Sequence, residues 1–315
     1  MIRDRIQAWL QSRLPRTDTW VLTQRNVYIL PTKAGLSFAL TLLLMLVASI
    51  NYQLNLGYVL TFLLAGAGGV SMHLTHNTLR GLTLHMRPAA PVFAGDAATL
   101  EVVLGNPGGP RHAISLHFQD RSGASRSFIT VDVPAAGQET THLRLVLPRR
   151  GWHEVPTLVV ETAFPFGLFR AWTQWRPALR VLAWPQPEQP APALPPASAL
   201  PGGGSAPQRS AGGELDGVRF YRRGDSMRQV VWKKVARSGE LVSRETSGSA
   251  SQELWLDWVH TPGADAERRL SRLSAWVQLA DRSGHTWGLR LPGHELPPAV
   301  GDGQRRAALD LLATW

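Results

Sequence analysis

The stretch of sequence that decides the fold is 34–79, which reads AGLSFALTLLLMLVASINYQLNLGYVLTFLLAGAGGVSMHLTHNTL. These 46 consecutive residues contain no Lys, Arg, Asp or Glu. A single helix of that length would measure about 70 Å, roughly twice the thickness of a bilayer core. The run is interrupted by the polar residues Asn51, Tyr52, Gln53 and Asn55, which leave apolar segments at 35–50 and 56–72. We therefore predict a transmembrane hairpin of two helices joined by a short polar loop.

Two other interpretations compete with the hairpin. A cleaved signal peptide fits poorly, because the apolar run begins far from Met1 and continues into a second run. A pair of helices buried in a soluble core is the remaining alternative. The second segment contains Gly57, Gly66, Gly68 and Gly69. Such small residues let two membrane helices approach closely, which favours the hairpin.

The cations that flank the hairpin predict its orientation. They are Arg3, Arg5, Arg13, Arg16, Arg25 and Lys33 before it, and Arg80 and Arg87 after it. The connecting loop carries none, and positive charge collects on the cytoplasmic side of bacterial-type membrane proteins. We expect a protein of the cell (inner) membrane with two spans, and with both the N- and the C-terminus in the cytoplasm.

The composition of the chain limits its chemistry. It has 315 residues and a formal net charge of +10, with 33 Lys+Arg against 23 Asp+Glu. Charged residues make up 18% of the chain, below the roughly 25% of an ordinary soluble domain. Cysteine is absent, which excludes disulfides, thiolate metal sites, iron–sulfur clusters and cysteine nucleophiles.

The N-terminal segment, 1–33, reads as cytoplasmic and amphipathic. Its apolar residues recur near the helical period and are Ile2, Ile6, Trp9, Leu10 and Leu14. A basic helix with a Trp on its apolar face suits a membrane interface. A helix packed on the following domain is the equally plain alternative.

Residues 80–185 change to a period of two. In 114–119 and 141–147 apolar and polar residues alternate, and Gly- and Pro-rich turns separate such runs. Short alternating strands with regular breaks predict an immunoglobulin-like β-sandwich. Between Pro185 and Pro207, 8 of 23 residues are proline, so 186–211 is predicted to be a Pro/Gly-rich linker without regular structure.

Residues 212–315 return to alternating strands and helices. Strands are expected at 218–221, 241–245, 254–259 and 287–291, and helices at 227–237, 264–281 and 304–314. Strand–helix–strand units of this kind form a parallel sheet covered by helices. The predicted fold class is a multidomain membrane protein, composed of a hairpin, a sandwich and a small α/β domain.

One segment of the α/β domain is distinctive. Residues 213–241 read GELDGVRFYRRGDSMRQVVWKKVARSGEL, and 213–248 hold eight cations and five acids. This segment closely resembles the hallmark of domain-of-unknown-function family 58. The likeness extends to Lys33-Ala-Gly35 before the hairpin, to Asn51 at its centre and to Phe164-Pro-Phe-Gly167-Leu-Phe169 in the β domain.

The resemblance implies a partner more than a reaction. Members of that family are membrane-anchored, have a C-terminal part similar to a von Willebrand factor A domain and are commonly associated with MoxR-type AAA ATPases. Their biochemical activity is undefined. This sequence departs from the family at Val231, where an acidic residue or a histidine is common.

The metal site of a von Willebrand A domain is degenerate here. A working site has Asp-x-Ser-x-Ser after its first strand, whereas this chain has Asp257-Trp-Val259-His-Thr261. Valine replaces the first hydroxyl that would help to hold Mg²⁺, so only the remnant Asp257 and Thr261 survives. We expect no bound metal and no cofactor, and a shortened von Willebrand A-like domain.

The hallmark segment is the predicted binding surface. The residues expected to contact a partner are Arg219, Tyr221, Gly224, Asp225, Arg228, Trp232, Lys233 and Arg237. Its charge suits an acidic protein loop, a nucleotide phosphate or anionic lipid headgroups, which attract basic segments near a membrane. The resemblance implies a MoxR-type ATPase as the protein partner. The structural alternative is an internal ion-pair network in which Asp225 caps a helix and pairs with an Arg. Nucleic acid is disfavoured, because no helix-turn-helix or aromatic RNP pattern accompanies the charge.

Three functions are consistent with this sequence. The first is a membrane-anchored, non-enzymatic adaptor or scaffold that works with a MoxR-type ATPase in protein or complex assembly. The second is a metal-dependent or hydrolytic enzyme that uses Asp257, Thr261 and Asp225. The third is an envelope-assembly factor with inverted topology. Sequence patterns of P-loop ATPases, zinc proteases and serine hydrolases are absent, which favours the first.

Overall fold

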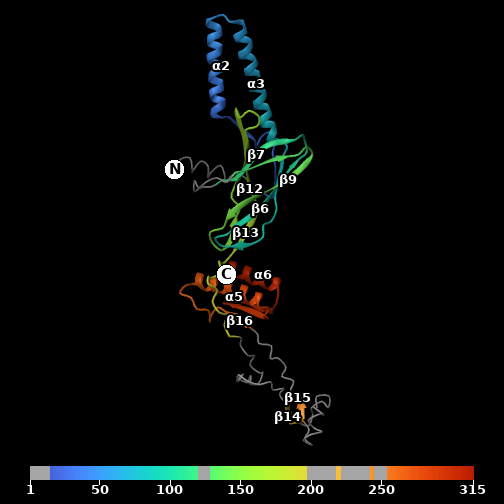
Figure 1. The fold of residues 1–315 in the computed structure, drawn as a ribbon, viewed down its shortest axis with the longest axis vertical. Helices are drawn as coiled ribbons and strands as arrows, with labels where there is room; N and C mark the ends of the chain where they lie inside the picture. The colour runs from blue at the N-terminus through green and yellow to red at the C-terminus, as the bar shows by residue number, and fades with distance from the viewer. Residues whose placement is uncertain (1–14, 120–127, 197–217, 221–241, 245–253) are drawn as a thin grey trace. The chain divides into compact units, whose positions relative to one another are not determined.

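The computed structural model describes residues 15–119, 128–196, 218–220, 242–244 and 254–315 (Figure 1). The chain divides into two compact units. One comprises Met1–Gln186 with Ala313–Trp315, and the other comprises Pro187–Leu312. Each unit is described by itself below.

Two long helices form the predicted hairpin (Figure 1). Helix α2 covers Lys33–Asn51 and helix α3 covers Asn55–Leu79, and both are long and apolar enough to cross a membrane. Only 11% of the most apolar stretch of α2 and 17% of that of α3 is buried. A core helix of a soluble protein buries its apolar residues, whereas these helices expose theirs.

The glycines of α3 divide between two faces. A Cβ on Gly57 would overlap the Ser49 hydroxyl of α2, and one on Gly68 would lie 3.2 Å from the Phe38 ring. A Cβ on Gly66 or Gly69 would meet nothing within 4 Å. The close approach expected of four glycines is therefore carried by two of them.

The last turns of α3 leave the hairpin and enter the β domain. The second span was predicted to end at residue 72, yet the helix continues to Leu79. Ser71, Thr75, Thr78 and Leu79 are buried, and Leu79 belongs to the core of the β domain. The small polar side chains at the end of α3 thus face protein.

Two sheets enclose that core. The first has the strand order β1-β12-β11-β7-β8, with β3 also paired to β12, and the second has the order β2-β4-β6-β9. The strands of the first sheet are β1 Arg16–Thr17, β3 Tyr28–Pro31, β7 Arg111–Phe118, β8 Ile129–Val133, β11 Leu158–Thr162 and β12 Phe169–Pro177. Those of the second are β2 Thr19–Val21, β4 Thr83–Met86, β6 Ala97–Asn106 and β9 Gly137–Val146.

A third, smaller sheet completes the β domain. Its order is β10-β13-β5, with strands at Gly151–Glu154, Arg180–Trp184 and Val92–Phe93 respectively. The β5 strand pairs with β13 in parallel, whereas β10 pairs with it antiparallel.

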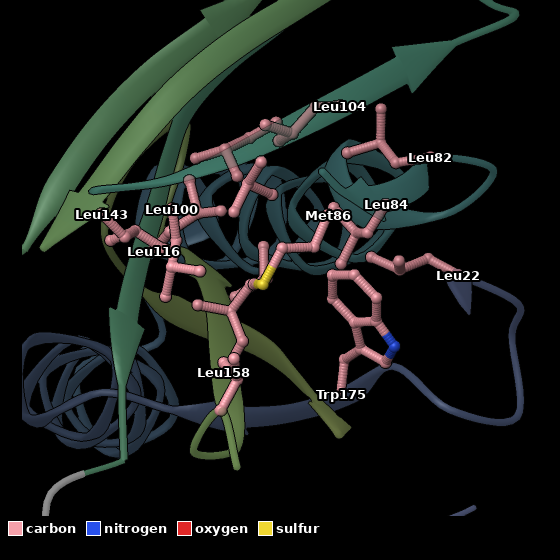
Figure 2. Packing of buried hydrophobic residues seen from close by; sticks show 14 of the residues in the cluster. Leu22, Leu82, Leu84, Met86, Leu100, Leu104, Leu116, Leu143, Leu158 and Trp175 are labelled. Atoms are coloured by element: carbon pink, nitrogen blue, oxygen red, sulfur yellow. The ribbon is translucent and has the colours of Figure 1, made fainter. Parts of the chain in front are cut away.

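Alternating residues of the two large sheets meet in one hydrophobic cluster. Figure 2 shows Leu100 of β6 beside Leu116 of β7, and Leu104, Leu158 of β11 and Met86 of β4 in the same cluster. Trp175 is fully buried, and its indole N–H donates to the carbonyl oxygen of Thr17 at 3.2 Å. The alternation of period two predicted at 114–119 and 141–147 is thus confirmed as strand structure.

The described part of the N-terminal segment, 15–33, is not separate from the β domain. Residues 1–14, with the predicted amphipathic helix, lie outside the described residues. Residues 16–31 form strands β1, β2 and β3, which pair with β12, with β4 and again with β12. These pairings join 16–31 to the β domain across the boundary predicted at residue 33. The sequence did not indicate these strands, because two to four residues are too few to show a period.

The second unit contains a small α/β arrangement. Strand β16 (Leu254–Asp257) and strand β17 (Trp287–Leu291) pair in parallel, and helix α5 (Ala266–Arg282) connects them. Strand β18 (His294–Ala299) then returns antiparallel to β17, so the sheet is mixed rather than wholly parallel as predicted. Helix α6 covers Asp302–Thr314, and the Gln304 amide donates to the carbonyl oxygens of Trp287 and Pro297. A separate pair, β14 (Val218–Phe220) and β15 (Val242–Arg244), is antiparallel.

Helix α5 has one buried face. Leu270, Leu273 and Val277 are fully buried, and Asp265 caps the helix by accepting from the backbone N–H of Arg268 at 2.7 Å. The described part of the Pro-rich segment, 187–196, forms no helix or strand. It nevertheless packs on α5, because the Trp276 indole donates to the carbonyl oxygen of Ala193 at 2.9 Å.

Candidate functional site

The predicted partner-binding residues lie mostly outside the described part of the chain. These are Tyr221, Gly224, Asp225, Arg228, Trp232, Lys233 and Arg237. Arg219 is described at the level of the backbone: it stands in β14, opposite Ser243 of β15. Paired strands are therefore present at 218–220 and 242–244, within the ranges predicted at 218–221 and 241–245.

The remnant of the metal motif forms a closed turn. Asp257 is the last residue of β16, and its Oδ1 accepts from the backbone N–H of Val259 at 2.8 Å. Its Oδ2 lies 3.3 Å from Nδ1 of the exposed His260. Thr261 is 2% exposed, and its hydroxyl donates to the carbonyl oxygen of Asp257 at 2.6 Å.

This geometry assigns the remnant to local structure. The Asp257 carboxylate stabilises the chain reversal after β16, as aspartates do in Asx turns. The Thr261 hydroxyl is turned to a backbone carbonyl rather than to an open coordination position. Among the described residues, no group of three or more His, Cys, Asp or Glu side chains is placed to hold a metal ion.

A surface pocket of about 450 Å³ lies beside the start of α5. It is lined by Glu188, Pro262, Gly263, Ala264, Arg268, Ser271 and Arg272. The Arg272 guanidinium donates to both carboxylate oxygens of Glu188, at 2.7 and 2.8 Å. This hydrogen bonding lowers the pKa of Glu188 and raises that of Arg272. The Glu188–Arg272 pair therefore attaches the Pro-rich segment to α5.

The most specific contacts of the first unit hold the start of α2. Thr32 is the N-cap residue, and its hydroxyl oxygen accepts from the backbone N–H of Gly35 at 3.0 Å. The same hydroxyl donates to the carbonyl oxygen of Gly167 at 2.5 Å, and the Thr32 backbone N–H donates to that of Leu168 at 2.9 Å. A Cβ on Gly35 would overlap the Leu168 carbonyl, so only glycine permits this approach.

A matching set of contacts holds the end of α3. The Thr75 hydroxyl donates to the carbonyl oxygen of Phe164 at 2.8 Å. Arg111, the first residue of β7, donates to the carbonyl oxygen of Asn77 at 2.5 Å and to that of Arg80 at 3.4 Å. A cation at this position complements the negative end of the helix dipole. Burial lowers the pKa of the Arg111 guanidinium, yet arginine stays protonated throughout the physiological range.

We call the segment Phe164–Phe169, which connects β11 to β12, the joint loop. The α2 start and the α3 end both bind to its backbone, through Thr32 and Thr75, so it lies between the two ends of the hairpin. The loop turns sharply, with Gly167 at φ +71 and its N–H bonded to the carbonyl oxygen of Ala163 at 2.8 Å. The hairpin and the β domain are therefore joined at two points rather than by flexible connections.

Only some of the residues that join the hairpin to the β domain stood out in the sequence. Lys33-Ala-Gly35 and the joint loop stood out as features of a resemblance, but no contact was assigned to them. The Thr32 cap had a local signal, since Thr directly before a helical apolar run is a start signal. Thr75 and Arg111 had none, because their acceptors lie 89 and 34 residues away.

Comparison with known proteins adds no family assignment. No protein-family model matches the chain, and no curated protein matches its sequence.

Proposed function

We propose that this protein is a membrane-anchored, non-enzymatic adaptor or scaffold of the cell (inner) membrane. One observation carries this proposal: the hairpin exposes an apolar surface along both helices, while both of its ends are held by the β domain. A bilayer is the solvent that such a surface requires. The anchor would hold the β domain in a defined position at the membrane.

The two ends of the hairpin lie on one side of the proposed bilayer. Lys33 begins α2 and Arg80 follows the last residue of α3, and both are exposed. The tip, 52–54, carries no charged residue. The positive-inside rule therefore places the β domain and the C-terminal unit in the cytoplasm. The inverted topology of an envelope-assembly factor would leave these cations on the wrong side.

We assign finer folds to the two units as part of this proposal. The β domain is an immunoglobulin-like sandwich, supported by two sheets around one core. The C-terminal unit is a shortened von Willebrand A-like domain. Support comes from the parallel β16–α5–β17 arrangement and from the position of Asp257 at the carboxyl end of β16.

The proposed partner is a MoxR-type AAA ATPase. The support is the resemblance of 213–241 to domain-of-unknown-function family 58, whose members are commonly associated with such ATPases. The enzyme alternative has weaker support, because the Asp257 carboxylate and the Thr261 hydroxyl are both engaged within their own turn.

Co-purification from native membranes in mild detergent tests the adaptor role. The wild type is compared with the double variant Arg228→Ala, Arg237→Ala in the hallmark segment. The control variant, Arg282→Ala with Arg306→Ala, removes the same charge from exposed positions of α5 and α6. We expect an ATPase to accompany the wild type and the control, and to be lost from the hallmark variant. Retention by all three proteins, or no ATPase with any of them, would contradict the proposal.

A further inference from the structure

We propose that the joint loop is a lipid-contact site: Phe164 and Phe166, with Leu30 of β3, enter the boundary between headgroups and acyl chains of the bilayer that the hairpin crosses. This inference rests on the membrane anchoring proposed above and adds a second point of contact from the β domain.

The lengths of α2 and α3 give the depth at which the hairpin meets the joint loop. From Lys33 to Asn51, α2 rises by about 27 Å, and from Asn55 to Thr75, α3 rises by about 30 Å, at 1.5 Å per residue. Both distances match a bilayer core of about 30 Å. Measured from the tip of the hairpin, each helix therefore leaves the hydrocarbon region where it meets the joint loop.

Hydrogen bonds to both helices hold the joint loop at that depth. The Gly167 and Leu168 carbonyls bind Thr32 at the first turn of α2, and the Phe164 carbonyl binds Thr75 of α3. The backbone of the joint loop is thus held by both helices at the level where the apolar region ends. Phe166 projects from this backbone between the two anchored positions of the chain.

The joint loop and β3 expose large apolar side chains. Phe166 is 67% exposed, Leu30 is 58% exposed and Phe164 is 38% exposed, although all three are large and apolar. The Phe164 backbone is bonded to Thr75 of α3, Phe166 directly precedes Gly167, whose carbonyl binds Thr32, and Leu30 lies three residues before the start of α2. Exposed apolar side chains at the level where a membrane span ends are in reach of lipid when the span is inserted.

The charges near the loop fit the same depth. Lys33 and Arg80 are exposed at the two helix ends, where phosphates of the headgroups would meet them. Further down β3, the Tyr28 ring packs on Trp172 with the ring centroids 4.9 Å apart. Aromatic side chains are enriched at membrane interfaces because their rings tolerate the transition from hydrocarbon to water.

Single nitroxide labels measure this depth directly. The chain has no cysteine, so an introduced cysteine is the only attachment point. Phe166→Cys is compared with Leu44→Cys in the middle of α2 and with Val146→Cys at the end of β9. The native side chains are comparably exposed, at 67, 61 and 61% respectively. The full chain is reconstituted in vesicles of phosphatidylethanolamine and phosphatidylglycerol, and collisions with oxygen and with a water-soluble nickel chelate are measured.

We expect Leu44→Cys to collide mainly with oxygen and Val146→Cys mainly with nickel. Phe166→Cys should favour oxygen, at a depth of about 5–10 Å below the phosphates, as interfacial apolar groups do. If Phe166→Cys is as accessible to nickel as Val146→Cys while Leu44→Cys is protected, the lipid-contact site is wrong and the anchor stands. If Phe166→Cys is shielded from both reagents, protein covers the patch and the inference is overturned. If Leu44→Cys is itself open to nickel, the proposed anchoring fails.

Discussion

Helices α2 and α5 are similar in length but treat their apolar residues in opposite ways. In α5, Leu270, Leu273 and Val277 face the domain core, while charged side chains take the other face. In α2, leucines such as Leu36 and Leu44 are about 60% exposed, and the helix has no charged residue after Lys33. The hydrophobic effect explains α5 in water, whereas the exposed leucines of α2 suit an apolar surrounding. The difference supports the proposal that α2 lies in a membrane.

Truncation of one leucine in each helix sharpens this comparison the most. Leu273→Ala leaves a cavity in the core of the second unit and should lower the free energy of unfolding by about 2–5 kcal/mol. Leu44→Ala leaves no cavity, because lipid or detergent fills the space. The free energy of unfolding of the first unit should therefore not change. Denaturant unfolding in detergent, followed by tryptophan fluorescence, measures both. An equal loss for Leu44→Ala would mean that α2 is packed in a protein core.

A charge in the middle of α2 should prevent insertion. Leu44→Arg costs about 2.5–3.5 kcal/mol at the centre of a membrane helix. In water the same change at an exposed site would shift stability by no more than about 0.5 kcal/mol. The matched control is Val146→Arg, at an equally exposed position of β9. Carbonate extraction should release the Leu44 variant from the membranes and retain the control. The opposite pattern would contradict the proposed position of α2 in the membrane.

The contact of Gly35 with the joint loop distinguishes the anchored end of the hairpin from its exposed surface. Gly35→Ala forces a Cβ onto the Leu168 carbonyl and should destabilise the contact by about 1–3 kcal/mol. Gly66→Ala of α3 adds the same methyl group where nothing lies within 4 Å. Amide hydrogen exchange at Thr32, whose N–H donates to Leu168, should quicken in the first variant only. Unchanged exchange in Gly35→Ala would show that the joint is not held as described.

The smallest effect concerns the charged face of α5. Arg272 lowers the pKa of Glu188, so the pair stabilises the folded state above the ordinary pKa of a glutamate. That contribution is lost as the pH falls through the lowered pKa of the folded state. Because Glu188 is 35% exposed, we expect less than about 1 kcal/mol. The Glu188 amide donates to Ser271, and its protection factor, which is the exchange rate corrected for the intrinsic rate at each pH, should fall at acidic pH. Glu188→Gln should remove this dependence. A wild type without this dependence would contradict the pair's role.

The sequence predicted those parts of the fold that have a long or regular pattern. Forty-six uncharged residues sufficed for the hairpin, and alternation in 114–119 and 141–147 sufficed for two strands. The strands at 16–31 were missed, because two to four residues carry no period. The antiparallel β18 was missed as well, since the two prolines in it weaken a strand pattern.

The candidate site was less predictable for a physical reason. A side-chain hydroxyl that binds a distant carbonyl leaves no trace in local composition, as Thr75 and Phe164 illustrate. Val259, which replaces a metal-binding hydroxyl, did indicate that the turn after Asp257 differs from a working metal site. That the carboxylate binds the N–H of Val259 itself depends on how the backbone turns after β16, which spacing alone does not determine.

Labelling from the two sides of the membrane tests the central claim most directly. Tyr52→Cys at the tip of the hairpin and Val146→Cys in the β domain are each the only cysteine of their variant, and both sites are exposed. Spheroplasts, whose inner membrane is intact and accessible from outside, are treated with a membrane-impermeant maleimide before and after lysis. We expect Tyr52→Cys to be labelled before lysis and Val146→Cys only after it. Labelling of both sites from the same side would contradict a hairpin that crosses the bilayer with its β domain in the cytoplasm.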